Sequence, residues 1–483
     1  MAEDQADELT KIRKAGIDPY AHRFDRNATA AEIIKNYSDI KADEKVEKTK
    51  VLTAGRIRSK RKHGGLVFVH IEDFSGRIQI FISASDVSKA DFELMERLNV
   101  GDFIGVEGCV MKTSRGELSI LAKKITLLTK ALLPLPSEWY GLKDEELRYR
   151  KRYLDMLLNP EVKDMLVKKS VFWRSMRDFM ISKGFIEVYT PVLENTTGGA
   201  DAKPFITHHN TLDIDVYLRI STGELWQKML LVGGFEKTFE IGRIFRNEGM
   251  DADHAQDYNQ LEFYWAYADY KDNMKLVEEM YKYVIQQTFG TMKFHIRGTD
   301  VDFGKRWKEY DYTGEIKKGT GIDINHTTAK ECIARLDELG VEYEKKGMNL
   351  ERAVDSLWKH CRKKINEPGF LVNHPLIVSP LAKKMEGNPK LVERFQVIFA
   401  GTEAGNGYSE LNDPIDQEQR FMEQAKLRTA GDEEAQMFAK DFVEALKYGM
   451  PPATGFGVSD RLFSLLMDKS IRECTTFPLL RPE

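Results

Sequence analysis

The stretch Phe239-Glu-Ile-Gly-Arg-Ile-Phe-Arg-Asn-Glu248 is followed, after a short loop, by Tyr258-Asn-Gln-Leu-Glu-Phe-Tyr-Trp265. Apolar residues alternate with other residues in both halves, which predicts two extended strands joined as a hairpin. Charged residues stand where a strand in a soluble core would normally exclude them: Arg243, Arg246, Glu248 and Glu262. We therefore expect this hairpin to carry inward charges and to build a site.

The length and composition indicate a multidomain globular protein. The chain has 483 residues, of which 42% are hydrophobic and 31% are charged. No apolar run is long enough to cross a bilayer, so no membrane partner is expected. The first residues lack the features of a secretory signal and of a transit peptide, which favours a cytoplasmic protein.

The cysteines and the net charge exclude other classes of site. Four cysteines lie far apart, without C-x-x-C spacing or a nearby histidine pair: Cys109, Cys332, Cys361 and Cys474. Neither a zinc site nor a disulfide framework is therefore expected. A formal charge of −4 gives no global nucleic-acid footprint. One local basic cluster runs from Arg56 to His63, and on its own it is typical of a solvated hairpin.

The first part of the chain predicts a helical arm and a small β-barrel. Residues 8–36 have helical spacing, with Pro19 as an ending signal. Five strand-like runs follow at 51–58, 66–72, 77–83, 103–111 and 117–128, with a helix near 86–98 between the third and fourth. This order is typical of an OB-fold, whose strand face binds single-stranded nucleic acid.

The remaining chain predicts one large domain with helices and strands. We expect the helical arm at 1–48, the OB-fold domain at 49–132, a proline-marked linker at 133–146 and the large domain at 147–483. Pro160 can begin a helix that Gly184 ends. A capping box of Thr328 and Glu331 predicts a later helix, in a stretch that carries no readable chemistry.

Three further stretches combine glycines with charged residues. They are Leu218-Arg-Ile-Ser-Thr-Gly-Glu224, Gly401-Thr-Glu-Ala-Gly-Asn-Gly-Tyr-Ser-Glu410 and Gly455-Phe-Gly-Val-Ser-Asp-Arg461. Glycine lets the backbone approach a nucleotide closely, although an isolated Gly-x-Gly is more often a turn. The order of these stretches along the chain is more informative than any one of them alone.

Three stretches resemble the motifs of the class II aminoacyl-tRNA synthetases: Gly184-Phe-Ile-Glu-Val-Tyr-Thr-Pro191 resembles motif 1 (about 168–193), the charged hairpin quoted at the outset resembles motif 2 (about 238–266), and Gly455-Phe-Gly-Val-Ser-Asp-Arg461 resembles motif 3 (about 453–470). The resemblance to the lysyl-tRNA synthetase branch runs over almost the whole chain, including Arg148-Tyr-Arg-Lys-Arg-Tyr-Leu-Asp155 and Pro204-Phe-Ile-Thr-His-His-Asn210. It implies an α+β multidomain protein whose catalytic domain is an antiparallel β-sheet flanked by helices. It also implies a homodimer, with motif 1 at the interface.

The implied activity is that of a lysine–tRNA ligase in protein biosynthesis. Such an enzyme joins L-lysine to ATP as lysyl-adenylate and then transfers lysine to the 3′ end of tRNA(Lys). The first reaction brings two anions together, so the site must neutralise charge on phosphate oxygens. Arginine side chains and Mg²⁺ suit this task, and no organic cofactor is needed.

The resemblance implies six ATP-binding residues, one of which, Glu403, would act through Mg²⁺. Arg246 would bridge the lysine carboxylate and the α-phosphate, and Arg461 would stack on adenine and reach the γ-phosphate. These two arginines are the expected catalytic residues. His254 would contact the γ-phosphate, Tyr258 would cover the other adenine face, and Glu248 would bind the adenine amino group.

A lysine pocket needs the opposite charge, because a desolvated ammonium is costly unless a carboxylate meets it. By resemblance, Glu410 and Tyr264 would bind the ε-ammonium, and Tyr408 would flank the aliphatic stem. The residues implied for the α-amino group are Glu224 and Glu262, and Asn406 would bind the carboxylate.

In the OB-fold domain, the family stacks and hydrogen-bonds a uridine-rich anticodon. The matching positions are Arg56, Phe68, Gln79 and Glu117. An aromatic side chain on an OB strand is a good stacking platform. The alternative that Phe68 is ordinary barrel core stays open on the sequence.

Three positions depart from the family pattern. Where that pattern has Arg-Phe-Glu, whose glutamate helps Glu403 bind Mg²⁺, this chain has Arg394-Phe395-Gln396. An amide offers an oxygen but no charge, so Gln396 is a weaker candidate ligand. Motif 3 is one residue shorter than usual, and Asp253 stands where a basic residue often precedes His254. These changes leave the metal number and the ATP affinity open.

Two alternatives remain. An aspartyl or asparaginyl enzyme of the same subclass would need a cation or amide readers at the end of its pocket. A paralogue that is non-catalytic, or that has a side activity, would keep the fold and lose site residues. Gln396 favours the second alternative slightly, and the retained Arg246, Glu248 and Arg461 oppose it.

Overall fold

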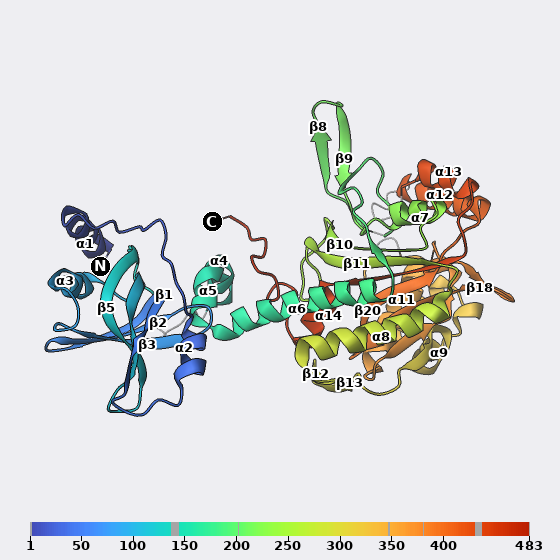
Figure 1. The fold of residues 1–483 in the computed structure, drawn as a ribbon. Helices are drawn as coiled ribbons and strands as arrows, with labels where there is room; N and C mark the ends of the chain where they lie inside the picture. Colours follow the sequence, from blue (N-terminus) through green and yellow to red (C-terminus); the bar gives the residue numbers. More distant parts are fainter. Residues whose placement is uncertain are drawn as a thin grey trace. The chain divides into compact units, whose positions relative to one another are not determined.

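The computed structural model describes residues 2–136, 144–200, 202–345, 348–379, 381–429 and 437–482. The chain divides into two compact units, Met1–Lys143 and Asp144–Glu483 (Figure 1). Residues 137–143 of the expected linker lie outside the described residues. The exact domain limits within these units stay predictions. No helix in the described part of the chain combines the length and apolar character that a membrane crossing requires.

The first unit contains a closed five-stranded barrel with the strand order β1-β2-β3-β5-β4. Its strands are β1 (Lys45–His63), β2 (Leu66–Glu72), β3 (Arg77–Ser83), β4 (Phe103–Lys112) and β5 (Leu118–Thr129), and α3 (Lys89–Arg97) lies between β3 and β4. Alternate residues of each strand face inward, as Val67, Val69 and Ile71 of β2 do. The expected OB-fold is confirmed.

The helical arm expected at 8–36 is interrupted. Two helices occur there, α1 (Ala2–Lys14) and α2 (Ala30–Tyr37), joined by an irregular segment. Gly16, with φ of 77°, ends the helical path shortly after α1. Thr29 and Glu32 form a capping box that starts a new helix.

The second unit is built on an eight-stranded sheet with the order β14-β15-β19-β20-β21-β11-β10-β6. The strands are β14 (Lys308–Asp311), β15 (Gly369–Val372), β19 (Arg394–Phe399), β20 (Thr402–Ser409), β21 (Ala453–Ser459), β11 (Asp257–Ala266), β10 (Lys237–Phe245) and β6 (Ile186–Glu187). The central pairs are antiparallel, whereas β14 pairs with β15 and β10 with β6 in parallel. The expected antiparallel sheet is therefore mixed at its two edges.

Two long helices, α6 (Pro160–Ser182) and α8 (Tyr270–Phe289), cover one face of this sheet (Figure 1). Phe172 and Met176 of α6 share one apolar core with Val277 of α8 and with Phe263 and Phe456 of the sheet. That core fixes β11 and β21, whose other side chains are free to build a site on the opposite face.

Shorter elements complete the second unit. The helices are α4 (Glu145–Arg150), α5 (Arg152–Leu158), α7 (Glu224–Val232), α9 (Tyr312–Thr320), α10 (Ala329–Glu338), α11 (Leu350–Cys361), α12 (Pro414–Thr429), α13 (Lys440–Lys447) and α14 (Asp460–Leu466), with 3₁₀ turns η1 (Ile324–His326), η2 (Arg362–Lys364) and η3 (Leu376–Val378). The strands are β7 (Leu193–Glu194), β8 (Ile206–His209), β9 (Ile214–Leu218), β12 (Lys293–Ile296), β13 (Thr299–Asp302), β16 (His374–Pro375), β17 (Lys384–Met385) and β18 (Asn388–Val392). The predicted capping box of Thr328 and Glu331 begins α10. The four cysteines are buried and free.

Candidate active site

A cavity of about 410 Å³ opens on the face of the large sheet opposite α6 and α8. Its lining side chains come mainly from β11, β20 and β21, which are adjacent in the sheet. Every residue predicted to bind ATP, lysine or metal lines it, except Glu248. Glu248 follows Arg246 in the loop after β10 and is outside the described lining, so its adenine contact stays a prediction.

Strand register explains how distant residues meet in this cavity. On β11, Glu262 pairs with Gly457 of β21 and Tyr264 pairs with Gly455. A Cβ on Gly455 would lie 2.5 Å from both Tyr264 Cε1 and Glu410 Oε1. The glycines of the last motif therefore leave room for the side chains of the neighbouring strands.

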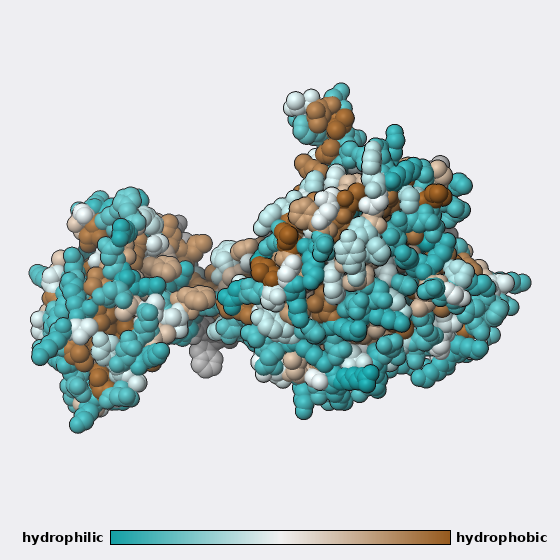
Figure 2. Space-filling view, turned by 45° about the vertical axis from the view of Figure 1, so that its right-hand side comes forward, coloured by the Kyte–Doolittle hydropathy of each residue, from teal (hydrophilic) through white to brown (hydrophobic). Residues whose placement is uncertain are grey.

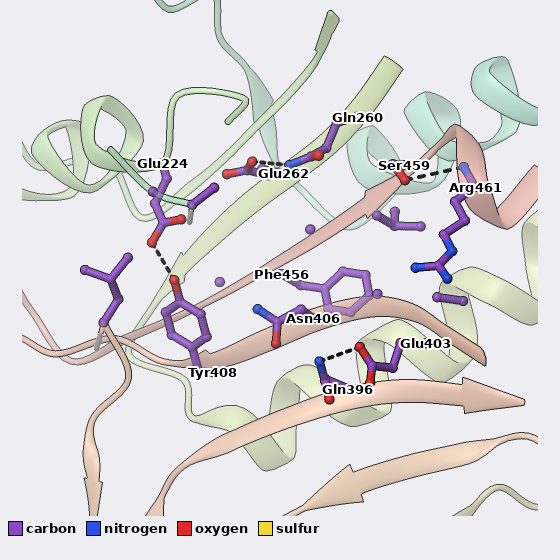
Figure 3. Close-up of a pocket in the computed structure, with 18 of the residues that line it drawn as sticks. Glu224, Gln260, Glu262, Gln396, Glu403, Asn406, Tyr408, Phe456, Ser459 and Arg461 are labelled. Atoms are coloured by element: carbon purple, nitrogen blue, oxygen red, sulfur yellow. Dashed lines mark hydrogen bonds between the residues drawn. The ribbon is translucent and has the colours of Figure 1, made fainter. Parts of the chain in front are cut away.

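Three buried carboxylates, those of Glu224, Glu262 and Glu410, form the acidic end of the cavity. Their exposed fractions are 4%, 4% and 1%. The Tyr408 hydroxyl donates to Glu224 Oε1 (Figure 3), and the Tyr264 hydroxyl donates to Glu262 Oε2 at 3.0 Å. No described residue donates a hydrogen bond to Glu410 Oε1. Buried carboxylates that lack a full set of hydrogen-bond donors favour a cationic ligand.

Burial sets the protonation of the acidic end. It raises the pKa of Glu410 to about 8, although Lys228 lowers it and Glu224 adds a like charge. Burial and the charge of Glu224 also raise the pKa of Glu262 to about 7. The empty pocket therefore retains protons near neutral pH, which a cation must displace.

Lys228, which the sequence reasoning missed, lies behind the acidic end. Its Nζ is 2.6 Å from Glu410 Oε2 and 2.7 Å from Glu224 Oε1. Burial lowers the pKa of Lys228, but the two carboxylates outweigh it and bring the pKa to about 12. The available signal was a lysine four residues after Glu224, on the same face of α7.

The opposite, cationic end of the cavity contains Arg246, His254 and Arg461. Arg246 donates through Nη2 to Ile220 O at 3.3 Å. Arg461 lies in the first turn of α14, and its Nη2 lies 3.3 Å from Asp253 Oδ2. Asp253 also pairs with Arg297, so this departure from the family pattern ties two arginines together.

One of the four expected inward charges is not inward. The side chain of Arg243 is 50% exposed and pairs with Asp257 on the neighbouring strand. This pair lies at the loop end of the β10–β11 hairpin, where β10 ends at Phe245 and β11 begins at Asp257. The prediction that Arg243 helps to build the site is wrong.

Glu403 and Gln396 lie side by side on the cavity wall (Figure 3). Gln396 Nε2 donates to Glu403 Oε2 at 3.0 Å, while Gln396 Oε1 is 3.1 Å from His374 Nε2. Burial lowers the pKa of His374 to about 3, so its ring is neutral.

The described residues contain no group of three or more potential metal-ligating side chains. One carboxylate and one amide oxygen nevertheless fit Mg²⁺, which normally keeps water and phosphate oxygens in its shell. Gln396 would have to turn its amide to offer that oxygen.

The helical stretch that carried no readable chemistry reaches this wall. Trp358 of α11 donates to Glu403 Oε1 at 2.8 Å, and Arg362 of η2 donates to the same oxygen at 2.7 Å. Burial raises the pKa of Glu403, but Arg362 and Trp358 more than offset it, so the pKa lies below its usual value. Glu403 is thus held ionised.

Comparison with known proteins places this geometry in a family. The model of the tRNA synthetases class II (D, K and N) matches residues 144–481, and that of the OB-fold nucleic acid binding domain matches residues 51–128. Lysine–tRNA ligase of Thermotoga maritima is 45% identical over 484 residues, covering 100% of this chain and 96% of that protein. The chain belongs to the class II lysyl-tRNA synthetases.

Other members of this family show similar sequence identity and coverage. Lysine–tRNA ligase of Thermosipho africanus is 44% identical over 483 residues, covering 99% of this chain and 96% of that protein. The enzyme of Fervidobacterium nodosum is 45% identical over 478 residues, covering 99% and 93%.

In this lysyl-tRNA synthetase the predicted anticodon residues differ in how accessible they are on the barrel. Phe68 faces away from the core residues Val67 and Val69, and its ring centroid is 5.1 Å from that of Phe81. Phe68 is therefore not barrel core. Gln79 is buried and donates to Ser119 Oγ at 2.8 Å.

The other two anticodon positions have protein partners. Glu117 lies 2.8 Å from His70 Nε2, and His70 pairs with Gln79 in the β2–β3 register. Arg56 donates to Gly101 O at 3.2 Å, and its guanidinium is 4.2 Å from the centroid of the Phe103 ring. His70 was missed because a single histidine in a strand carries no motif.

Proposed function

We propose that this protein activates L-lysine with ATP to lysyl-adenylate and pyrophosphate, and then transfers lysine to the 3′ end of tRNA(Lys). The observation that carries the proposal is the cavity with three buried carboxylates at one end and arginines at the other. This charge pattern suits a substrate with two ammonium groups that reacts with a polyphosphate. A cytoplasmic location is part of the proposal.

The acidic end selects the amino acid. The ε-ammonium of lysine binds Glu410, whose Oε1 has no hydrogen-bond donor among the described residues. Glu224 and Glu262 bind the α-ammonium. The side-chain oxygen of Asn406 accepts a hydrogen bond from Arg394 Nε at 2.8 Å. Its side-chain NH₂ group is then left to donate to the lysine carboxylate.

The cationic end aligns the phosphates. Arg246 neutralises the α-phosphate as a lysine carboxylate oxygen forms the new bond to phosphorus and pyrophosphate leaves. Arg461 and His254 bind the γ-phosphate, and Tyr258 covers the adenine. Glu403, together with Gln396, would hold Mg²⁺, which would supply further neutralisation of phosphate charge when bound. No protein nucleophile is required, because the substrate carboxylate attacks.

ATP–pyrophosphate exchange with each of the twenty amino acids tests the proposal. We expect exchange with lysine and little with the others. Exchange with aspartate or asparagine alone would favour the related enzymes of the subclass, whose substrates need a cation or amide readers where Glu410 lies. Absence of exchange with every amino acid would favour a non-catalytic paralogue.

Lysine binding should strengthen as the pH rises. Because the raised pKa values of Glu410 and Glu262, about 8 and about 7, favour the protonated acids, the empty pocket must lose protons to bind an ammonium. The lysine KM should fall about a hundredfold per pH unit below pH 7, where both acids are protonated, about tenfold per unit between pH 7 and pH 8, and level off above about pH 8. Calorimetry in buffers of different ionisation enthalpy should detect the released proton, and a KM that is flat from pH 6 to 8.5 would contradict this account.

Phe68→Ala should weaken recognition of tRNA without affecting lysine activation. Loss of one base stack costs about 1–3 kcal/mol, so the tRNA KM should rise by roughly 5- to 150-fold. ATP–pyrophosphate exchange should stay unchanged, because the cavity lies in the other unit. Phe74→Ala, at a side chain that is 81% exposed in the β2–β3 loop, is the matched control. An equal fall in both activities would indicate a structural defect.

We further propose a homodimer that uses the segment around motif 1. Large apolar side chains are exposed there: Ile186, Tyr189, Leu193, Ile206, Leu212 and Ile214. The last three lie on the β8–β9 hairpin, which projects from its unit with apolar side chains at its surface (Figure 2). Such exposed apolar groups are typical of an interface.

Sedimentation equilibrium should therefore give twice the chain mass of 55.5 kDa. Ile206→Asp combined with Leu212→Asp should shift the protein toward monomer by burying charge at the contact. Tyr448→Asp, at a side chain that is 81% exposed outside this segment, should not. A wild-type monomer that is active at assay concentrations would refute the dimer.

A further inference from the structure

The ammonium of Lys228 is an internal part of the acidic end. The side chain is 2% exposed and is not among the described residues that line the cavity. Its Nζ lies between Glu224 Oε1 and Glu410 Oε2 and within 6 Å of three aromatic ring centroids: Tyr264 at 5.7 Å, Tyr408 at 5.5 Å and Phe442 at 5.9 Å. It therefore contacts the two carboxylates from the side away from the substrate.

This contact fixes which oxygen of Glu410 remains for a ligand. Lys228 engages Oε2, whereas Oε1 points to the cavity-lining Gly455 and Tyr264. On Glu224, Oε1 is taken by Lys228 and Tyr408, and Oε2 lies beside the cavity-lining Gly199. Each of these two carboxylates thus keeps one oxygen toward the cavity.

Lys228 also sets the charge of the pocket. Glu224, Glu262 and Glu410 together carry three negative charges when ionised, and Lys228 cancels one of them. The remaining two match the two ammonium groups of lysine. Without Lys228, one buried carboxylate would stay unmatched in the complex, which is unfavourable in a site of low dielectric.

We propose that Lys228 is a positioning and specificity-determining residue for lysine recognition. It acts from behind the pocket, orienting Glu224 and Glu410 and adjusting their total charge to a substrate with two ammonium groups. This inference rests on the proposed lysine activation. It adds a residue that does not itself touch the substrate.

The test compares lysine binding in Lys228→Met and Lys228→Gln with that in the wild type. We expect the lysine Kd and KM to rise by about 100-fold in both variants, because a buried charge loses its partner. The ATP KM should stay within about threefold, because the phosphates bind at the other end. Lys237→Met is the matched control, since Lys237 also lies over two aromatic rings but outside the described cavity lining.

A double-mutant cycle with Glu410→Gln separates positioning from a structural role. In the double variant Lys228→Met/Glu410→Gln, the residues of the acidic end again have a formal charge of −2. Its lysine Kd should therefore be no higher than that of Glu410→Gln alone. The inference would be overturned if the factors by which the two substitutions raise the lysine Kd multiply in the double variant. It would also be overturned if the lysine Kd is unchanged in both Lys228→Met and Lys228→Gln. If the Met variant does not fold, the Gln variant carries the cycle.

The wild-type exchange assay distinguishes this failure from a failure of the proposed function. Lysine-dependent exchange in the wild type, together with normal lysine binding by the Lys228 variants, would reject only the role of Lys228. No lysine-dependent exchange in the wild type would reject the proposed function itself.

Discussion

Glu410→Gln is expected to raise the lysine KM by about 150- to 5,000-fold and to leave the ATP KM within about threefold. The substitution removes the carboxylate whose free oxygen faces the cavity, and an uncompensated buried ammonium costs about 3–5 kcal/mol. Steady-state ATP–pyrophosphate exchange at varied lysine and varied ATP measures both constants.

Two controls make the Glu410 result interpretable. Glu410→Asp keeps the charge but withdraws it by one methylene, so its lysine KM should lie between that of the wild type and that of Glu410→Gln. Glu309→Gln, on the exposed edge strand β14, should behave as the wild type. Equal losses for lysine and ATP in Glu410→Gln would indicate a general collapse of the cavity, and unchanged lysine kinetics would refute the pocket assignment.

Arg246→Ala is expected to reduce the rate of adenylate formation by about 1,000-fold. The guanidinium lies in the cavity, held by Ile220 O, where negative charge develops on the α-phosphate. Arg246→Lys should remain about 100-fold impaired, because an ammonium keeps the charge but loses the planar pair of donors. Single-turnover formation of lysyl-adenylate measures this step directly.

Arg243→Ala is the matched control for Arg246. It removes the same side chain three residues earlier on the same hairpin, where the structure shows an exposed pair with Asp257. Its adenylation rate and its melting temperature should stay near those of the wild type. A similar loss in the two variants would mean that the hairpin, and not the cavity guanidinium, is the sensitive feature.

Local patterns predicted the strands, and the resemblance to the synthetase family implied most of the site residues that line the cavity. Alternation located the β10–β11 hairpin and the barrel strands, because each strand has one face on a core. It misplaced Arg243, because alternation distinguishes two faces but does not show where a hairpin leaves the core. The helical spacing at the start of the chain did not show that a second helix follows the first, which Gly16 and the capping box at Thr29 explain.

Contacts between distant segments could not be predicted in this way. Trp358 and Arg362 reach Glu403 across more than forty residues, and no local spacing relates them to it. Lys228 was missed for a different reason. Its helix reads as an ordinary amphipathic element, and only the fold reveals that its polar member is enclosed by carboxylates.

The contact of α11 and η2 with Glu403 changes how the segment from α9 to η2 should be regarded. By sequence it resembles an appendage that could be shortened or exchanged without consequence. By contact it supplies two of the three side-chain donors that the described residues offer to Glu403. A truncated or chimeric protein designed around the three motifs alone would therefore keep the motif residues and lose two of the donors that hold Glu403 in the cavity wall.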